Sequence, residues 1–204
     1  MNQHRNVAIL IFNDVEILDF CGPYEVFGIT GGRNNTQPFK VYTVAAATPI
    51  IARNQLSINP QYTLENCPQP DILLIPGGYG TRQQMHNQNL LDWIKECSKQ
   101  TELTLSVCTG ALLLAKAGLL ENLAATTHHL AIDLLKQTAP NTEIRANERF
   151  VDNGKIILSA GISAGIDMSL YVVAKLLGKK QAIETAEYME YDWKSTEAGT
   201  ILSN

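Results

Sequence analysis

The sequence predicts an α/β protein, in which helices cover both faces of a doubly wound and mostly parallel sheet. Short aliphatic runs alternate along the chain with longer segments of helical period, and this alternation is typical of such sheets. The aliphatic runs are almost uninterrupted, as in parallel strands that are buried on both faces. The length of 204 residues favours one domain, which we expect over residues 1–191, followed by a polar tail over residues 192–204.

The predicted elements alternate from near the N-terminus to residue 191. Ligands in such sheets bind beyond the carboxyl ends of the strands, so residues that directly follow a strand are the first functional candidates. The strands are expected at Val7–Phe12, Phe39–Ala46, Asp71–Ile75, Leu103–Val107 and Lys155–Ser159. The helices are expected at Pro23–Ile29, Gln88–Gln100, Gly110–Leu119, His129–Lys136, Ser163–Leu177 and Lys180–Tyr191.

Composition and charge argue against several classes of protein. With 45% apolar and 18% charged residues, the chain is neither disordered nor collagen-like. Sixteen Lys and Arg against twenty Asp and Glu give a net charge of −4 with no basic block, so we expect no nucleic-acid or membrane partner. The first apolar run is too short for a signal peptide or a membrane span. We therefore expect a cytoplasmic protein with free thiols at Cys21, Cys67, Cys97 and Cys108 and no metal site.

Cys108 is the candidate nucleophile. It directly follows the predicted strand Leu103–Val107 and precedes Thr109, Gly110 and an apolar helix, which is the context of a nucleophile elbow. The positive end of the helix dipole favours a thiolate, so we expect a thiol pKa below the ordinary value of about 8.5. The alternative is a buried structural cysteine at a strand end. The other three cysteines lack an elbow and are expected to be structural.

The turn Pro76-Gly77-Gly78-Tyr79-Gly80 follows another predicted strand. Its backbone N–H groups are candidates for an oxyanion hole, which needs two donors directed at one point. By itself, such a turn more often reflects only the need for positive φ angles.

Asp19 follows the first predicted strand, in a loop, and its neighbours Ile17, Leu18 and Phe20 are apolar. Burial among apolar side chains raises the pKa of a carboxyl group and makes it a proton donor near neutral pH. The alternative for a carboxylate in this loop is capping of a helix.

His128 follows a short apolar stretch and is a candidate for orienting the thiol or aiding proton transfer. A hydrogen-bonded histidine at a helix start is the favoured interpretation, and more strongly so for His129. The glycines Gly161 and Gly165 lack the spacing of a phosphate-binding loop. We expect them in a strand-to-helix turn that packs near the site.

Together these segments resemble the ThiJ/PfpI family of the class I glutamine amidotransferase-like superfamily, and more closely its isonitrile hydratase branch. The resemblance extends from near the N-terminus to about residue 191, and it implies a flavodoxin-like sheet, a homodimer and a nucleophilic elbow cysteine. The residues that carry it are Leu18–Phe27, Ile75–Gly78, Ser106–Gly110, Ala117–Leu120, Ala125–His128 and Gly161–Asp167.

The resemblance also implies roles for individual residues. Cys108, Asp19 and Thr109 correspond to the catalytic residues of the branch, and the N–H groups of Gly78 and Thr109 correspond to oxyanion-hole donors. Gly77, Tyr79 and His128 complete the expected oxyanion and substrate-binding set.

Three departures from other members bear on function. Peptidase-like members have His where this chain has Thr109, so a Cys-His dyad of that type is not available. Deglycase and glyoxalase-like members use Glu in place of Asp19. The sensing halves of AraC-type regulators continue into a helix-turn-helix region, whereas this sequence ends at Asn204.

The favoured hypothesis is a lyase that hydrates a small isonitrile to an N-substituted formamide, with no metal or organic cofactor. A thiolate beside a protonated carboxyl supplies the nucleophile and the acid that one isonitrile carbon requires. The alternatives are a glyoxalase-like enzyme or hydrolase acting on small carbonyl compounds or amides, and a non-catalytic sensor in which Cys108 is oxidised.

Overall fold

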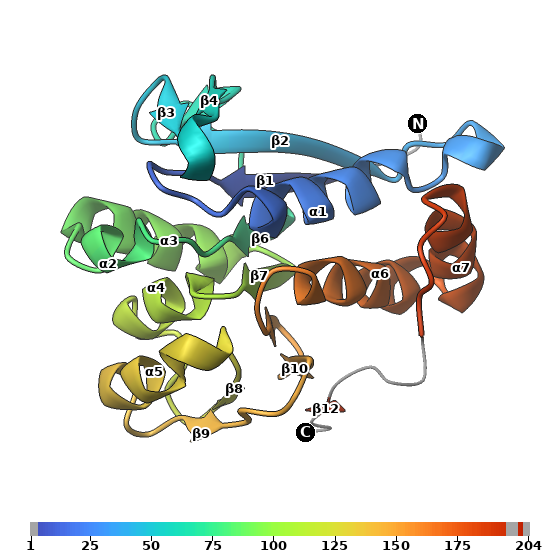
Figure 1. Cartoon of the computed structure of the whole chain (residues 1–204). Coiled ribbons are helices and arrows are strands. Elements are labelled where there is room, and N and C mark those ends of the chain that lie inside the picture. The colour runs from blue at the N-terminus through green and yellow to red at the C-terminus, as the bar shows by residue number, and fades with distance from the viewer. Residues whose placement is uncertain (1–3, 195–199, 202–204) are drawn as a thin grey trace.

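An eight-stranded sheet in the order β12-β10-β11-β7-β6-β1-β2-β5 runs through the molecule (Figure 1). The computed structural model of the chain describes residues 4–194 and 200–201. Every neighbouring pair in this sheet is parallel except β10 with β11. The strands are β1 (Arg5–Leu10), β2 (Phe39–Ala45), β5 (Tyr62–Thr63), β6 (Ile72–Ile75), β7 (Leu103–Val107), β10 (Phe150–Asp152), β11 (Ile156–Ser159) and β12 (Thr200–Ile201).

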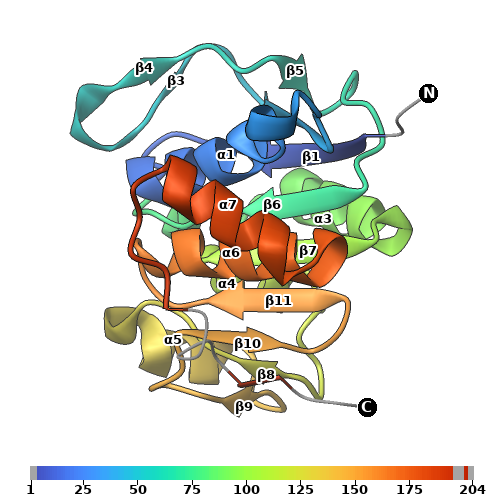
Figure 2. The ribbon, with the colours of Figure 1, turned by 90° about the vertical axis from the view of Figure 1, so that its right-hand side faces the viewer.

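Helices cover both faces of the sheet, so the predicted doubly wound α/β class is confirmed. On one face lie α1, α6 and α7, and on the other lie α3 and α4, as the two views show (Figures 1 and 2). The helices are α1 (Ile17–Ile29), α2 (Thr81–Gln84), α3 (Gln88–Gln100), α4 (Gly110–Lys116), α5 (Ile132–Thr138), α6 (Ala164–Leu177) and α7 (Lys179–Tyr188).

Shorter elements connect the main ones. Two small sheets pair β3 (Ile50–Ile51) with β4 (Ser57–Ile58) and β8 (Ala124–Ala125) with β9 (Glu143–Ile144). Single 3₁₀ turns span Gly32–Asn34, Arg53–Gln55 and His129–Ala131.

The five predicted strands are present, and their central residues form the core. Every residue of β6 and β7 is buried, as is the second half of β1. Burial on both faces accounts for the uninterrupted aliphatic sequences of β6 and of the second half of β1, whereas β7 also buries Thr104 and Ser106. Helix α3 has the predicted bounds, and Asn87 caps it by accepting the Leu90 N–H at 3.3 Å. No helix in the described part of the chain has the length and apolar character needed to cross a membrane.

The expected start of the first helix is wrong. Helix α1 begins at Ile17, six residues before the predicted start at Pro23, so Asp19 lies in a helix and not in a loop. Proline is common at the first helical position, but here it lies inside α1. Pro23 has no N–H for the carbonyl of Asp19 four residues earlier.

Part of the predicted polar tail belongs to the sheet. Thr200 and Ile201 form β12, which pairs in parallel with Val151 and Asp152 of β10. Residues 195–199 and 202–204 of that tail lie outside the described residues. The domain boundary at residue 191 stays a prediction.

The topology brings the candidate segments to one edge. Strands β1, β6, β7 and β11 are adjacent and parallel, so their carboxyl ends meet. The segments that follow them carry Asp19, the Gly77-Gly78 turn, Cys108 and the turn at residues 160–163.

Candidate active site

Cys108 lies at the junction of β7 and α4, where the backbone makes the predicted sharp turn. Its φ of +55° is in the left-handed region, which a residue with a side chain occupies only under strain. The Cys108 N–H donates to the carbonyls of Ser159 (3.2 Å) and Ala160 (3.1 Å). A side chain at Gly110 would overlap the Ile75 carbonyl. The geometry is therefore that of a nucleophile elbow, in which only glycine fits two residues after the cysteine.

Asp19 is fully buried in the first turn of α1. Its Oδ2 accepts a hydrogen bond from the Gly77 N–H at 3.0 Å. Its Oδ1 has no partner of normal hydrogen-bond geometry among the described residues, and the Cys108 thiol lies beside the carboxyl. The side chain does not cap α1, because Glu16 is the N-cap residue. Asp19 therefore faces the elbow cysteine and has one oxygen unpaired.

The carboxyl group of Asp19 titrates near neutral pH. Burial raises its pKa from the ordinary 3.8 to about 7, against the opposing effects of the Cys108 thiol and the Gly77 N–H. The negative charge of Glu16 raises it further. The expected burial of Asp19 and the rise of its pKa are confirmed, while its role in proton transfer, which a pKa near 7 would suit, stays a prediction.

The expected lowering of the thiol pKa is wrong. Burial raises the pKa of Cys108 to about 12, and the charge of Asp19 acts in the same direction. The backbone N–H groups of Thr109 and Ile162 are hydrogen-bonded to the sulfur and oppose this rise. The helix dipole is outweighed because the cysteine is 5% exposed and lies next to a carboxyl group. Cys108 therefore keeps its proton at neutral pH, next to a carboxyl group that titrates there.

The glycine turn after β6 contacts both Asp19 and the residue after the nucleophile. The Gly78 N–H donates to Thr109 Oγ1 at 3.0 Å, so this predicted oxyanion donor is engaged by a side chain. Thr81 Oγ1 also lies 3.2 Å from Thr109 Oγ1. A Cβ at Gly77 would lie 2.6 Å from Thr109 Oγ1 and 2.8 Å from Asp19 Oδ2. The turn needs glycine at position 77 because two site residues occupy the space of a side chain.

His128 stands beside the turn at residues 160–163. Its ring occupies the place that a Cβ at Gly161 would take, and its Nδ1 accepts the Leu130 N–H at 3.3 Å. Burial and the charges of His129 and Arg82 lower the pKa of His128, which keeps the ring neutral. These contacts fit the favoured interpretation of a hydrogen-bonded histidine, and its contact with substrate stays a prediction.

Tyr79 follows the glycine turn and is 70% exposed. The guanidinium carbons of Arg53 and Arg82 lie over its ring, at 5.6 and 5.4 Å from the ring centre. Tyr79 is thus a rim residue, and its substrate-binding role stays a prediction.

The other cysteines stay outside this constellation. Cys21, Cys67 and Cys97 are free thiols, and burial raises the pKa of each. Within residues 4–194 and 200–201, no group of three or more His, Cys, Asp or Glu side chains is placed to hold a metal ion.

Comparison with known proteins decides the family. The model of the DJ-1/PfpI family matches residues 5–175. The chain belongs to the DJ-1/PfpI family. The elbow cysteine and the glycine turn described above lie within the matched residues.

Relatives of this DJ-1/PfpI protein include an enzyme and regulators. It is 33% identical over 185 residues to the isonitrile hydratase of Pseudomonas putida, covering 90% of this chain and 75% of that protein. It is 30% identical over 139 residues to the HTH-type transcriptional regulator CdhR of Pseudomonas aeruginosa, covering 68% of this chain but only 41% of the regulator.

Solved structures of DJ-1/PfpI proteins share the fold. A ThiJ/PfpI family protein from Pseudomonas syringae superposes with a TM-score of 0.84 at 29% identity, covering 94% of this chain and 77% of that one. DJ-1beta of Drosophila melanogaster superposes with a TM-score of 0.79 at 18% identity, covering 94% of this chain and 100% of that one. This second likeness concerns the fold alone.

Two features of this DJ-1/PfpI site were missed by sequence reasoning. The Ile162 N–H opposes the rise in the pKa of Cys108, and Ile162 has a φ of +52°, an angle that no residue type signals at isoleucine. Arg82 contacts the glycine turn through Gly78 O at 3.3 Å. The position of Arg82 three residues after Tyr79 was the available indication in the sequence that its side chain lies near the glycine turn.

Proposed function

We propose that this DJ-1/PfpI protein is an isonitrile hydratase-like lyase, which adds water to R–N≡C and releases R–NH–CHO. The observation that carries the proposal is a buried carboxyl group with a pKa of about 7 beside the thiol of an elbow cysteine. The terminal carbon of an isonitrile accepts both a nucleophile and a proton. A pair that shares one proton can supply both at a single atom.

In the first step, Cys108 adds to the substrate. The Asp19 carboxylate takes the thiol proton as the sulfur attacks the terminal carbon, and then passes it to that carbon. A C–S bond and a C–H bond form, and the product is a thioimidate, R–N=CH–S–Cys. The N–H groups of Thr109 and Ile162 stabilise the sulfur while it carries negative charge.

In the second step, water attacks the thioimidate carbon. Asp19 accepts the water proton and delivers it to the substrate nitrogen, which gives a tetrahedral adduct. The adduct collapses when the C–S bond breaks, and its hydroxyl proton returns to the sulfur as the formamide leaves. The unpaired Oδ1 of Asp19 is the oxygen available to orient this water.

The remaining site residues position these groups. Gly77 fixes Asp19 through its N–H, and the hydroxyl of Thr109 is held by the Gly78 N–H. We assign Tyr79 and His128 to the rim that receives the substituent of the substrate.

A second candidate function is a non-catalytic sensor. Its support is the similarity to transcriptional regulators, of which CdhR is 30% identical over 68% of this chain. In such a protein the same pocket binds a ligand, and Cys108 undergoes no turnover.

Turnover of an isonitrile separates these functions. Purified protein is incubated with cyclohexyl isonitrile, and N-cyclohexylformamide is followed by mass spectrometry. We expect formamide from the wild type and from Cys97→Ser, the matched control at a buried thiol in α3, and none from Cys108→Ser. Consumption of methylglyoxal without formamide would instead select a glyoxalase-like enzyme, and inertness to both would select the sensor.

We also propose a cytoplasmic homodimer. A reducing compartment keeps Cys108 as a free thiol. The segment Ile17–Phe27 is mainly apolar and exposes Leu18 by 39%, which offers a contact close to Asp19. Light scattering at micromolar concentration tests the assembly, and a monomer mass would refute it.

A further inference from the structure

The turn between β11 and α6 lies against the nucleophile. The Cys108 N–H donates to the carbonyls of Ser159 (3.2 Å) and Ala160 (3.1 Å), and the Ile162 N–H opposes the rise in the pKa of the Cys108 thiol. Ile162 has a φ of +52°, which is unusual for a β-branched residue and costs free energy. Such a conformation persists only where the surroundings hold it. The turn therefore needs anchors outside itself.

Arg149 forms hydrogen bonds with this turn at two points. Its carbonyl accepts the Ala160 N–H at 2.9 Å, and its Nη2 donates to Ser163 Oγ at 3.3 Å. Its guanidinium is paired with the Asp167 carboxylate in the first turn of α6.

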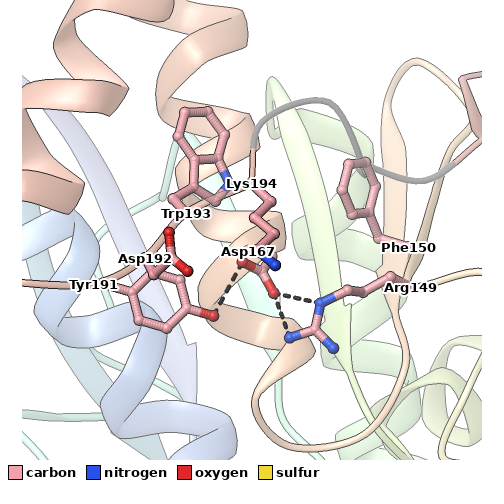
Figure 3. A pocket seen from close by; sticks show the side chains of 7 residues that line it. All are labelled: Arg149, Phe150, Asp167, Tyr191, Asp192, Trp193 and Lys194. Carbon is pink, nitrogen blue, oxygen red and sulfur yellow. Dashed lines mark hydrogen bonds and ion pairs between the residues drawn. The ribbon is translucent and has the colours of Figure 1, made fainter.

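Asp167 is itself fixed from the other side. Tyr191 donates its hydroxyl hydrogen to Asp167 Oδ1 at 3.1 Å, as Figure 3 shows beside the Arg149 pair. The Asp167 side chain is 14% exposed, and a cavity of about 170 Å³ opens next to the pair. The network thus runs from Tyr191 through Asp167 and Arg149 to the turn.

We propose that Arg149 and Asp167 are positioning residues, which hold the turn that carries the Ile162 N–H in place beside Cys108. Without the Arg149–Asp167 pair, the turn can relax from its strained conformation, and the Ile162 N–H then moves away from Cys108. A donor that faces sulfur favours the thiolate over the thiol. The pair therefore acts on the reactivity of Cys108 without touching it.

This inference rests on the proposed function, in which Cys108 is the reacting group, but its test does not use an isonitrile. Asp19 from α1 is the charged side chain that raises the pKa of the Cys108 thiol. It is unchanged in every variant below, so its effect on the thiol is the same in all of them. Iodoacetamide alkylation of Cys108, followed by peptide mapping across pH 6–10, reports thiolate formation directly.

We expect Arg149→Gln to displace the pH–rate curve of Cys108 by about one unit to higher pH. That shift corresponds to alkylation about tenfold slower at fixed pH, as expected for loss of one hydrogen bond to a charged group. The double variant Arg149→Gln/Asp167→Asn keeps the net charge of the pair and should give the same shift. Ser163→Ala removes only the contact with the turn and should give a smaller one.

The same helix offers a matched control. Lys175 of α6 pairs with Asp152 of β10 at 2.7 Å, and Asp152 has a side-chain exposure of only 1%. Lys175→Gln breaks an ion pair of the same kind, far along α6 from the turn. We expect it to lower the melting temperature and to leave the alkylation curve in place.

The inference is overturned if Arg149→Gln leaves the curve unchanged, or if Lys175→Gln shifts it equally, which would mean general loosening of α6. If the wild type fails to hydrate isonitriles while the curves behave as expected, the proposed function fails and the positioning role stands.

Discussion

Asp19 and Cys108 meet at the centre of the site although the helices they adjoin cover opposite faces of the sheet. Asp19 lies in α1 and Cys108 immediately before α4, and both side chains are buried. Burial raises the pKa of both groups, and the charge of Asp19 raises the pKa of Cys108 further, whereas the Cys108 thiol lowers the pKa of Asp19. The pair therefore releases its first proton near pH 7 and keeps the second far into the alkaline range.

The first prediction concerns Asp19→Asn. Asparagine keeps the size and the acceptor for the Gly77 N–H, but it exchanges no proton near neutral pH. We expect isonitrile turnover to fall by about 10²- to 10⁴-fold, while alkylation of Cys108 becomes faster because a charge that opposes the thiolate is gone. Parallel measurement of both rates tests this. Near wild-type turnover would show that Asp19 is structural.

The second prediction is the pH dependence of turnover. Below about pH 7 the Asp19 carboxyl is protonated, so the thiol has no base and cannot form a nucleophile. We expect kcat/KM to rise with pH to a plateau, with a midpoint near 7. A rate that is constant from pH 5 to 9 would contradict the shared-proton mechanism.

The third prediction is the pH dependence of stability. The pKa of Asp19 is about 7 in the folded protein and 3.8 as its ordinary value, so the folded state binds this proton more tightly than the unfolded state. Protonation of Asp19 therefore adds to the free energy of unfolding. This stabilisation is present in full below pH 3.8 and is lost as pH rises through 7, by about 4 kcal/mol in total.

Urea unfolding of the wild type and Asp19→Asn between pH 4 and 8 isolates this contribution. We expect the free energy of unfolding of Asp19→Asn to exceed that of the wild type increasingly toward pH 8. A constant difference across this range would place the pKa of Asp19 near its ordinary value.

The fourth prediction concerns Gly77→Ala. The new methyl would clash with Thr109 Oγ1 and Asp19 Oδ2, so we expect strong loss of turnover and destabilisation by about 1–3 kcal/mol. Gly28→Ala in α1 is the control, because no atom lies within 4 Å of its added Cβ, and it should be neutral or slightly stabilising. Equal activity of the two variants would remove the argument for a close-packed turn at residue 77.

The fold and the elbow could be predicted because their signals are local. A continuous aliphatic run marks β6, and Leu103, Leu105 and Val107 mark β7, which Cys108 directly follows. The apolar neighbours of Asp19 in the chain indicated its burial and hence the direction of its pKa.

Long-range geometry could not be predicted in the same way. The helix dipole at Cys108 is visible in the sequence, but the opposing effects of burial and Asp19 arise only when α1 packs beside the elbow. The place of the Ile162 N–H depends on a backbone angle, and the Arg149–Asp167 pair joins the residue before β10 to the first turn of α6. Neither is encoded in the spacing of residues.

The main sheet ends on both sides in strands of only two residues, β12 and β5. A short edge strand presents few unpaired N–H and C=O groups to another chain, and this discourages edge-to-edge aggregation. The two residues of β5 therefore offer a second copy of this protein few groups with which to extend the sheet beyond this strand.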